Sequence, residues 1–247
     1  MSETESSVKE QVSDPSPKKP SDNQQSGFFG NLVFNIAIPV LIMTYASSDE
    51  YLGPAWSIVV ALAFPLTYGL IELKKTKKVN LFSVLGIVSV LLTGGISLLK
   101  LPAEYMAIKE ATIPAAIGLA VLITQFTKKP LVKALILSDA LVNWEKLDAK
   151  LEEKNATALF NSKVAISSYI VAGSFFLSAC LNYGLAKWIL VSEPGTSAYT
   201  EELGRMTALS YPVIVIPSMI LLITALVYLF KQISKVTGDP VEEYLRQ

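Results

Sequence analysis

Six long apolar stretches, each almost free of charged residues, constrain this chain more than any other feature of its sequence. They are Phe28–Ala46, Leu52–Ile71, Val79–Leu99, Ile108–Phe126, Val164–Ala186 and Met206–Phe230. A helix rises about 1.5 Å per residue, so roughly 20 apolar residues cross the ~30 Å hydrocarbon layer of a membrane. We therefore predict an all-α fold, a polytopic transmembrane helical bundle with six spans.

A soluble helical bundle is the alternative to this prediction. The chain has 247 residues, of which 51% are apolar, and its mean hydropathy is +0.46. Six helices that are apolar on nearly every side would leave too little polar surface to cover such a bundle in water. Composition therefore favours the membrane.

The lysine and arginine residues predict which way the spans run. If the chain is cut at the six stretches, seventeen of its 21 basic residues fall on one side and four on the other. The four are Lys100, Lys109, Lys187 and Arg205. Basic residues accumulate on the cytoplasmic side of membrane proteins, so we expect both the N- and C-termini in the cytoplasm.

The spans divide the chain into five segments. We predict a disordered cytoplasmic tail over 1–25, spans one to four within 26–130, a cytoplasmic amphipathic linker helix within 131–159, spans five and six within 160–230, and a cytoplasmic tail over 231–247. The first segment lacks large apolar side chains, so its burial could not offset the entropy of ordering the chain. The longest predicted outer loop is Lys187–Arg205.

The linker helix is expected to run from Leu131 to Lys154. Its apolar residues recur at helical spacing on one face, and they are Leu137, Leu141, Trp144, Leu147 and Leu151. Acidic and basic residues nearly cancel along it, whereas helices held on anionic lipid have a strongly basic polar face. This favours packing against the bundle or a second protein, with Leu137, Leu141, Trp144 and Leu147 as candidate partner contacts; a plain linker lying at the membrane surface is the alternative.

The composition excludes most catalytic constellations. The chain has no histidine and one cysteine, Cys180, within the fifth apolar stretch. This removes triads built on histidine, imidazole metal sites and disulfide frameworks. There is no phosphate-binding glycine loop, and a net charge of zero argues against nucleic-acid binding. We predict no enzyme, no cofactor, no metal site and no catalytic residue.

Five polar residues within or beside the spans are the candidate functional residues. They are Asn35, Thr93, Lys109, Glu110 and Asn182. Ionisable groups inside a span are costly and often mark a pathway. Lys109 and Glu110 are neighbours on a helix and should not face each other, so each is expected to find another partner or to reach the outer interface, with Glu110 near the outer boundary.

Prolines recur inside the apolar stretches, as they do in the broken helices of transporters. Ile38-Pro39 and Ile113-Pro114 each follow a polar residue by four positions, which would suit two inverted repeats of three spans. Ile216-Pro217 has no place in such a repeat. The pattern is thus weak support for a transporter, with chance as the alternative.

Several short motifs between about residue 80 and 230 resemble the bacterial intracellular septation protein A family. The motifs are Gly94-Gly95, Ile108-Lys109, Lys128-Lys129-Pro130-Leu131, Trp144 and Ser178-Ala179-Cys180-Leu181-Asn182. The resemblance implies a small polytopic inner-membrane protein linked to envelope synthesis and cell division through protein partners, without enzymatic activity. It marks Lys109, Lys129, Pro130, Trp144 and Asn182 as important. The polar tail, the charged linker and the longer outer loop depart from the family pattern.

Two functions follow as hypotheses. The first is a non-enzymatic inner-membrane protein of the bacterial cell envelope that acts through membrane protein partners of division or wall synthesis. The second is a small secondary transporter or permease. Both place the chain in the lipid bilayer of the plasma membrane, and both leave a homo-oligomer open.

Overall fold

The described part of the chain is helical and contains no strand. The computed structural model describes residues 33–76, 81–127, 130–137 and 141–246; the predicted tail over 1–25 lies outside these ranges. The elements are η1 (Val33–Ala37), α2 (Ile38–Tyr45), α3 (Gly53–Thr76), α4 (Leu81–Leu98), α5 (Ala103–Thr124), α6 (Leu131–Ile136), α7 (Trp144–Glu153), α8 (Thr157–Ile189), α9 (Ser197–Ser210), η2 (Tyr211–Val215), α10 (Ile216–Thr237) and η3 (Val241–Tyr244).

Four helical segments are long and apolar enough to cross a membrane. They are Gly53–Ile71, Ala103–Thr124, Thr157–Ile189 and Ser197–Thr237. Two further predicted spans appear within the described residues as shorter apolar helices, Asn35–Tyr45 and Val84–Leu98. The predicted outer loop is also shorter than expected, because α8 continues to Ile189 and α9 already begins at Ser197.

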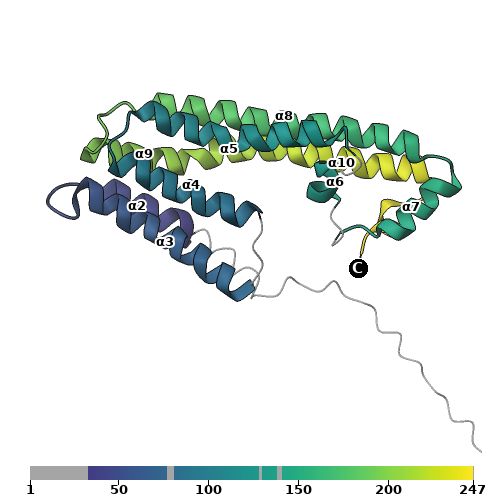
Figure 1. The fold of residues 1–247 in the computed structure, drawn as a ribbon, viewed down its shortest axis with the longest axis horizontal. Helices are drawn as coiled ribbons and strands as arrows, with labels where there is room; N and C mark the ends of the chain where they lie inside the picture. The colour runs from purple at the N-terminus through teal and green to yellow at the C-terminus, as the bar shows by residue number, and fades with distance from the viewer. Residues whose placement is uncertain (1–32, 77–80, 128–129, 138–140, 247) are drawn as a thin grey trace, which may run out of the picture.

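Helices α5 and α8 form the most extensive helix contact of the molecule, and we call them the core pair. A Cβ atom at Gly118 would lie 3.2 Å from Cβ of Phe175 and 3.3 Å from the carbonyl oxygen of Ala172. The two backbones can approach this closely only because position 118 has no side chain. Small residues at a contact are how membrane helices gain van der Waals packing. Helix α10 also packs along α8 (Figure 1).

Helix α3 packs against both α2 and α4, and these three helices form a second group, which we call the arm. Its main links to the rest of the bundle are the contacts of α2 with α9 and of α4 with α5. Figure 1 shows the arm below the core pair, joined to it at the end where the loops 46–52, 99–102 and 190–196 lie. We call this end the loop end.

The opposite end of the core pair carries a compact cap made of α6, α7 and the segment 238–246 (Figure 1). Backbone hydrogen bonds join the two parts: the Asn143 amide donates to the Tyr244 carbonyl (2.8 Å) and the Arg246 amide to the Leu141 carbonyl (2.9 Å). Between them, Val142 and Leu245 form an isolated antiparallel bridge. The residues predicted to be a plain C-terminal tail therefore continue α10 to Thr237 and then dock against the linker.

The linker has two short helices where the sequence predicts one. Helix α6 ends at Ile136 and α7 begins at Trp144, with Asn143 as its N-cap, since the Asn143 side chain accepts a hydrogen bond from the Lys146 amide. Asparagine favours caps over helix interiors because its side chain competes for backbone groups. The break allows Leu137 to be buried in the same core as Leu147 and Leu151.

Candidate functional site

The candidate site is a buried cation that joins the core pair to the arm. The Lys109 ammonium on α5 donates hydrogen bonds of 2.7 Å to Thr93 Oγ1 on α4 and 2.7 Å to Glu110 Oε1. The side chain of Lys109 is 6% exposed and that of Glu110 is 25% exposed. Thr93 in turn donates to the Ser89 carbonyl (3.0 Å). The charge is therefore held by one carboxylate and one hydroxyl.

The expectation that Lys109 and Glu110 do not pair is wrong. Neighbouring side chains leave a helix in different directions, but lysine has a long flexible stem that can bring its ammonium round to the next residue. The expectation rested on the directions of the Cβ atoms and neglected this reach. Bringing the two charges together offsets part of the cost of removing each from water.

The pair also lies further inside α5 than the sequence suggests. The sequence predicts an apolar stretch that begins at Ile108, yet α5 begins at Ala103 after Pro102, whose backbone angles are non-helical. Glu110 is thus seven residues into the helix, or about 10 Å along its axis. Among the candidate residues, Thr93, Lys109 and Glu110 meet at one place.

The other two candidate residues lie elsewhere. Asn182, on α8, donates to the Ser178 carbonyl (2.8 Å) and to Ser178 Oγ (3.3 Å), both one turn earlier in the same helix. Asn35 lies in η1, which packs against α3 and α9. The structure therefore gathers three of the five residues into one polar cluster.

The candidate partner contacts divide between core and surface. Leu137 and Leu147 are buried in the core of the cap, while Leu141 is 50% exposed. Trp144 is half-buried, and its indole N–H donates to the Leu137 carbonyl (3.1 Å) across the helix break. Of the four residues, Leu141 is the one that offers most of its side chain to a partner.

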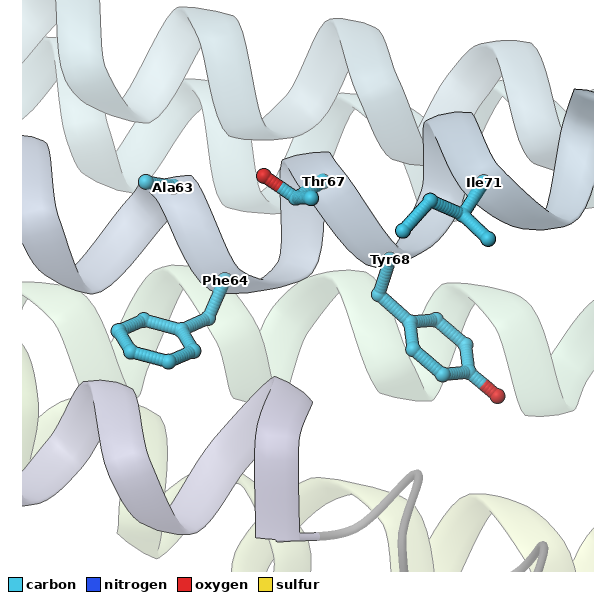
Figure 2. A pocket seen from close by; sticks show the side chains of 5 residues that line it. All are labelled: Ala63, Phe64, Thr67, Tyr68 and Ile71. Carbon is cyan, nitrogen blue, oxygen red and sulfur yellow. The ribbon is translucent and has the colours of Figure 1, made fainter.

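An apolar cavity of about 460 Å³ lies against α3, on the side of the arm away from the loop end. It is lined by Ala63, Phe64, Thr67, Tyr68 and Ile71. Figure 2 shows the Phe64 and Tyr68 rings extending from the same side of α3, with the Tyr68 hydroxyl at the far end of its ring. The volume of this cavity is within the range of small-molecule sites. Its mostly apolar lining suits an apolar ligand.

Sequence reasoning missed the polar closure of the loop end. The Glu202 carboxylate, on α9, accepts hydrogen bonds from the Val191 and Ser192 amides (3.0 Å each) and from the Ser192 hydroxyl (2.7 Å). Ser197 Oγ donates to the Ser47 carbonyl (2.8 Å), which joins this loop to the one after α2. The sequence places Glu202 in the predicted outer loop Lys187–Arg205, and nothing next to it along the chain indicates hydrogen-bond partners about ten residues away.

The cap carries a cluster of paired charges around a hollow of about 360 Å³. Lys146 pairs with Glu243 (3.1 Å), and Lys150 pairs with Glu153 (3.1 Å) and Asp239 (3.9 Å). The hydrogen bond to Glu153 raises the pKa of the partly exposed Lys150 ammonium.

Tyr244 holds the C-terminal part of the cap in place. Its ring is buried and its hydroxyl donates to Asp239 Oδ2 (2.8 Å). Burial, and then the bond to Asp239, raise the pKa of the Tyr244 hydroxyl. The signal for this contact in the sequence is Gly238 with Asp239-Pro240, a helix stop followed by a turn, but the partner surface of Tyr244 could not be read from it.

No cluster in the described part of the chain could hold a metal ion through three or more His, Cys, Asp or Glu residues. Comparison with protein-family models, with curated proteins and with solved structures found no match. The resemblance to the septation protein A family therefore stays a prediction, and two of its motif residues, Lys128 and Lys129, lie outside the described residues.

Proposed function

We propose that this chain is a non-enzymatic, multi-pass protein of the bacterial inner membrane that acts through a protein partner bound at the cap. In this proposal the six apolar stretches are spans, both termini are cytoplasmic and the cap faces the cytoplasm. The excess of basic residues on the cap side of the bundle supports this orientation. The septation resemblance suggests a partner in division or wall synthesis.

The observation that carries the proposal is the construction of the cap. Two segments more than a hundred residues apart are joined by backbone hydrogen bonds at Asn143 and Arg246, and both bury apolar side chains in one core. Such a body presents a defined surface, whereas a linker and a loose tail would not. The cap lysines Lys146 and Lys150 are paired with carboxylates, so this surface suits a protein of mixed charge better than an anionic membrane.

The exposed Leu141 allows a direct test. The variant Leu141→Glu places a charge on the cap surface and should reduce recovery of a co-purifying partner from cross-linked membranes by more than tenfold. The matched control is Leu159→Glu on α8, because Leu159 is 51% exposed against 50% for Leu141. Equal partner recovery with both variants, at equal folding, would remove Leu141 from the interface and contradict the proposal.

The orientation has its own test. Single cysteines introduced at exposed Glu153 and at exposed Glu193, in a Cys180→Ser background, should react differently with a membrane-impermeant thiol reagent added to intact spheroplasts. Glu193, in the loop after α8, should be labelled, and Glu153, in α7, only after lysis. The reverse pattern would place the cap outside and remove the cytoplasmic partner.

A small transporter is the second candidate, and the cavity against α3 together with the buried Lys109–Glu110 pair favours it. A titratable pair within a span suits proton coupling. Vesicles containing the protein and a trapped pH-sensitive dye should then dissipate an imposed pH gradient, and Glu110→Gln should abolish this flux. Absence of flux above that of empty vesicles would count against proton coupling in the wild-type protein.

A further inference from the structure

A second cavity, of about 230 Å³, lies where the end of α5, the start of α6 and the first turns of α8 meet. Unlike the cavity against α3, it is lined by polar side chains from three elements. Gln125 comes from the end of α5, Lys133 from α6 and Asn161 from α8. None of these side chains belongs to the Lys109 cluster or to the partner surface around Leu141.

Among the described residues that line this cavity, Lys133 alone carries a positive charge. It lies 5.2 Å from the centre of the Trp144 ring and 5.6 Å from that of Phe160, and it donates to Asn161 Oδ1 at 3.4 Å. In the ranges that the structure describes, no carboxylate lies within the 4.0 Å of an ion pair. Burial lowers the pKa of Lys133, only partly opposed by Asp148.

Lys133 therefore differs from the cap lysines beside it. Lys146 and Lys150 each have a carboxylate partner, whereas Lys133 has two aromatic faces and one amide oxygen. A half-buried ammonium without a counter-ion is costly. An anion entering the cavity would supply the missing charge.

Gln125 adds a second, independent indication. Its Oε1 atom is buried and has no hydrogen-bond partner among the described residues. Buried polar atoms are nearly always paired, so the Gln125 amide is left with a hydrogen bond to make to water or to a ligand in the cavity. A half-turn about its terminal bond exchanges the Gln125 oxygen for the N–H donors, which would then face an acceptor in the cavity.

We propose that this cavity binds a phosphate group, with Lys133 supplying the charge and the amides of Gln125 and Asn161 supplying further hydrogen bonds. A phosphate offers several strong acceptors to a lysine ammonium. The cavity lies just beyond Thr124, where the apolar segment Ala103–Thr124 ends. If this segment spans the membrane, as proposed above, the cavity lies at the depth at which the phosphates of lipid headgroups meet the hydrocarbon. An anionic phospholipid is therefore the expected source, and free phosphate is the other.

The test uses the full chain in neutral detergent and follows its thermal unfolding during titration with phosphatidylglycerol, with a diacylglycerol of the same acyl chains, or with sodium phosphate. We expect phosphatidylglycerol to raise the unfolding temperature and diacylglycerol, which lacks the phosphate, to leave it unchanged. Lys133→Gln should weaken the apparent affinity for phosphatidylglycerol about tenfold or more, since it removes a charge-assisted hydrogen bond. If sodium phosphate also raises the unfolding temperature, and Lys133→Gln removes this rise, the site is supported with free phosphate as its ligand.

Lys163→Gln is the matched control, because it also removes one lysine charge near the cavity, from the first turns of α8, at a residue that does not line the cavity. Equal loss of the lipid effect in the two variants, or an equal response to diacylglycerol, would overturn the proposal. If Lys133→Gln fails to fold, Asn161→Asp decides the question. Its carboxylate would occupy the position of the amide oxygen 3.4 Å from the ammonium and should compete with the phosphate; undiminished binding in Asn161→Asp would overturn the site.

Discussion

The core pair and the arm are built from similarly apolar helices, yet they pack very differently. In the spanning segments, 39% of residues are buried in α8 and 28% in α5, against 17% in α3. Helix α5 places Gly118 against the backbone of α8. Helix α3 instead places the large side chains of Phe64 and Tyr68 beside a cavity (Figure 2).

This difference shows that hydropathy alone does not decide how tightly a membrane helix packs. Lipid is as apolar as a leucine side chain, so no hydrophobic driving force draws the helices together, and close approach depends on small residues and polar contacts. The core pair has both, and at its edge Lys109 reaches across to Thr93 on the arm. The arm is held mainly at the loop end.

Removal of the Lys109 charge should have the largest effect on this arrangement. Lys109→Met leaves Glu110 without its partner and should lower the free energy of unfolding by about 3 kcal/mol, the lower end for breaking a buried pair. The double variant Lys109→Met, Glu110→Gln leaves no uncompensated charge and should recover most of this loss. Thermal unfolding in detergent measures both; equal losses would show that the pair is not coupled.

A side chain at Gly118 should disrupt the core pair itself. Gly118→Val forces a branched side chain against Phe175 and the Ala172 carbonyl and should destabilise the protein by about 1–3 kcal/mol, as overpacking does. Gly173→Val, on α8, is the control, because a Cβ there meets nothing within 4 Å. The same loss in both variants would indicate a general effect of valine on helix stability instead of a tight contact.

The cap lies at the end of the core pair and has no counterpart on the described part of the arm. Its stability should depend on the Tyr244 hydroxyl. Tyr244→Phe removes the hydrogen bond to the partly exposed Asp239 and should cost about 1 kcal/mol. The pKa of Tyr244 is raised in the folded protein, so its contribution is complete below the ordinary tyrosine pKa of about 10 and is lost as the pH rises through the folded value. Unfolding temperatures between pH 8 and 11 should therefore fall more steeply for the wild type than for Tyr244→Phe; parallel curves would contradict this.

The smallest effect is expected within the arm. A Cβ at Gly94 would lie 3.2 Å from Leu62 Cδ1, the end of a flexible side chain, while a Cβ at Gly95 meets nothing within 4 Å. Alanine is favoured over glycine in a helix by up to ~1 kcal/mol. Gly95→Ala should therefore raise the unfolding temperature, and Gly94→Ala should do so slightly less. A large loss in Gly94→Ala would mean that the arm is as tightly packed as the core pair.

The helical fold and its apolar segments could be predicted because they depend on residues that are neighbours in the sequence. The pairing of Lys109 with Glu110 and Thr93 could not, since it depends on side-chain reach and on the position of α4. The break after Ile136 and the burial of Tyr244 arise from contacts between segments far apart in the chain. The structure also pairs the Ile-Pro motifs differently from the repeat hypothesis. Ile38-Pro39 and Ile216-Pro217 each follow a π-helical segment, whereas Ile113-Pro114 lies within the regular helix α5.

The π-helical segment η2 sets the angular phase of the longest helical run, Ser197–Thr237. A π turn accommodates one residue more than an α turn, and one residue corresponds to about 100° of rotation about the helix axis. Everything after Val215 is therefore turned relative to everything before Tyr211. The first part of the run packs mainly on α2 and the second mainly on α8, so one continuous helix presents its apolar stripe to two neighbours that lie in different directions.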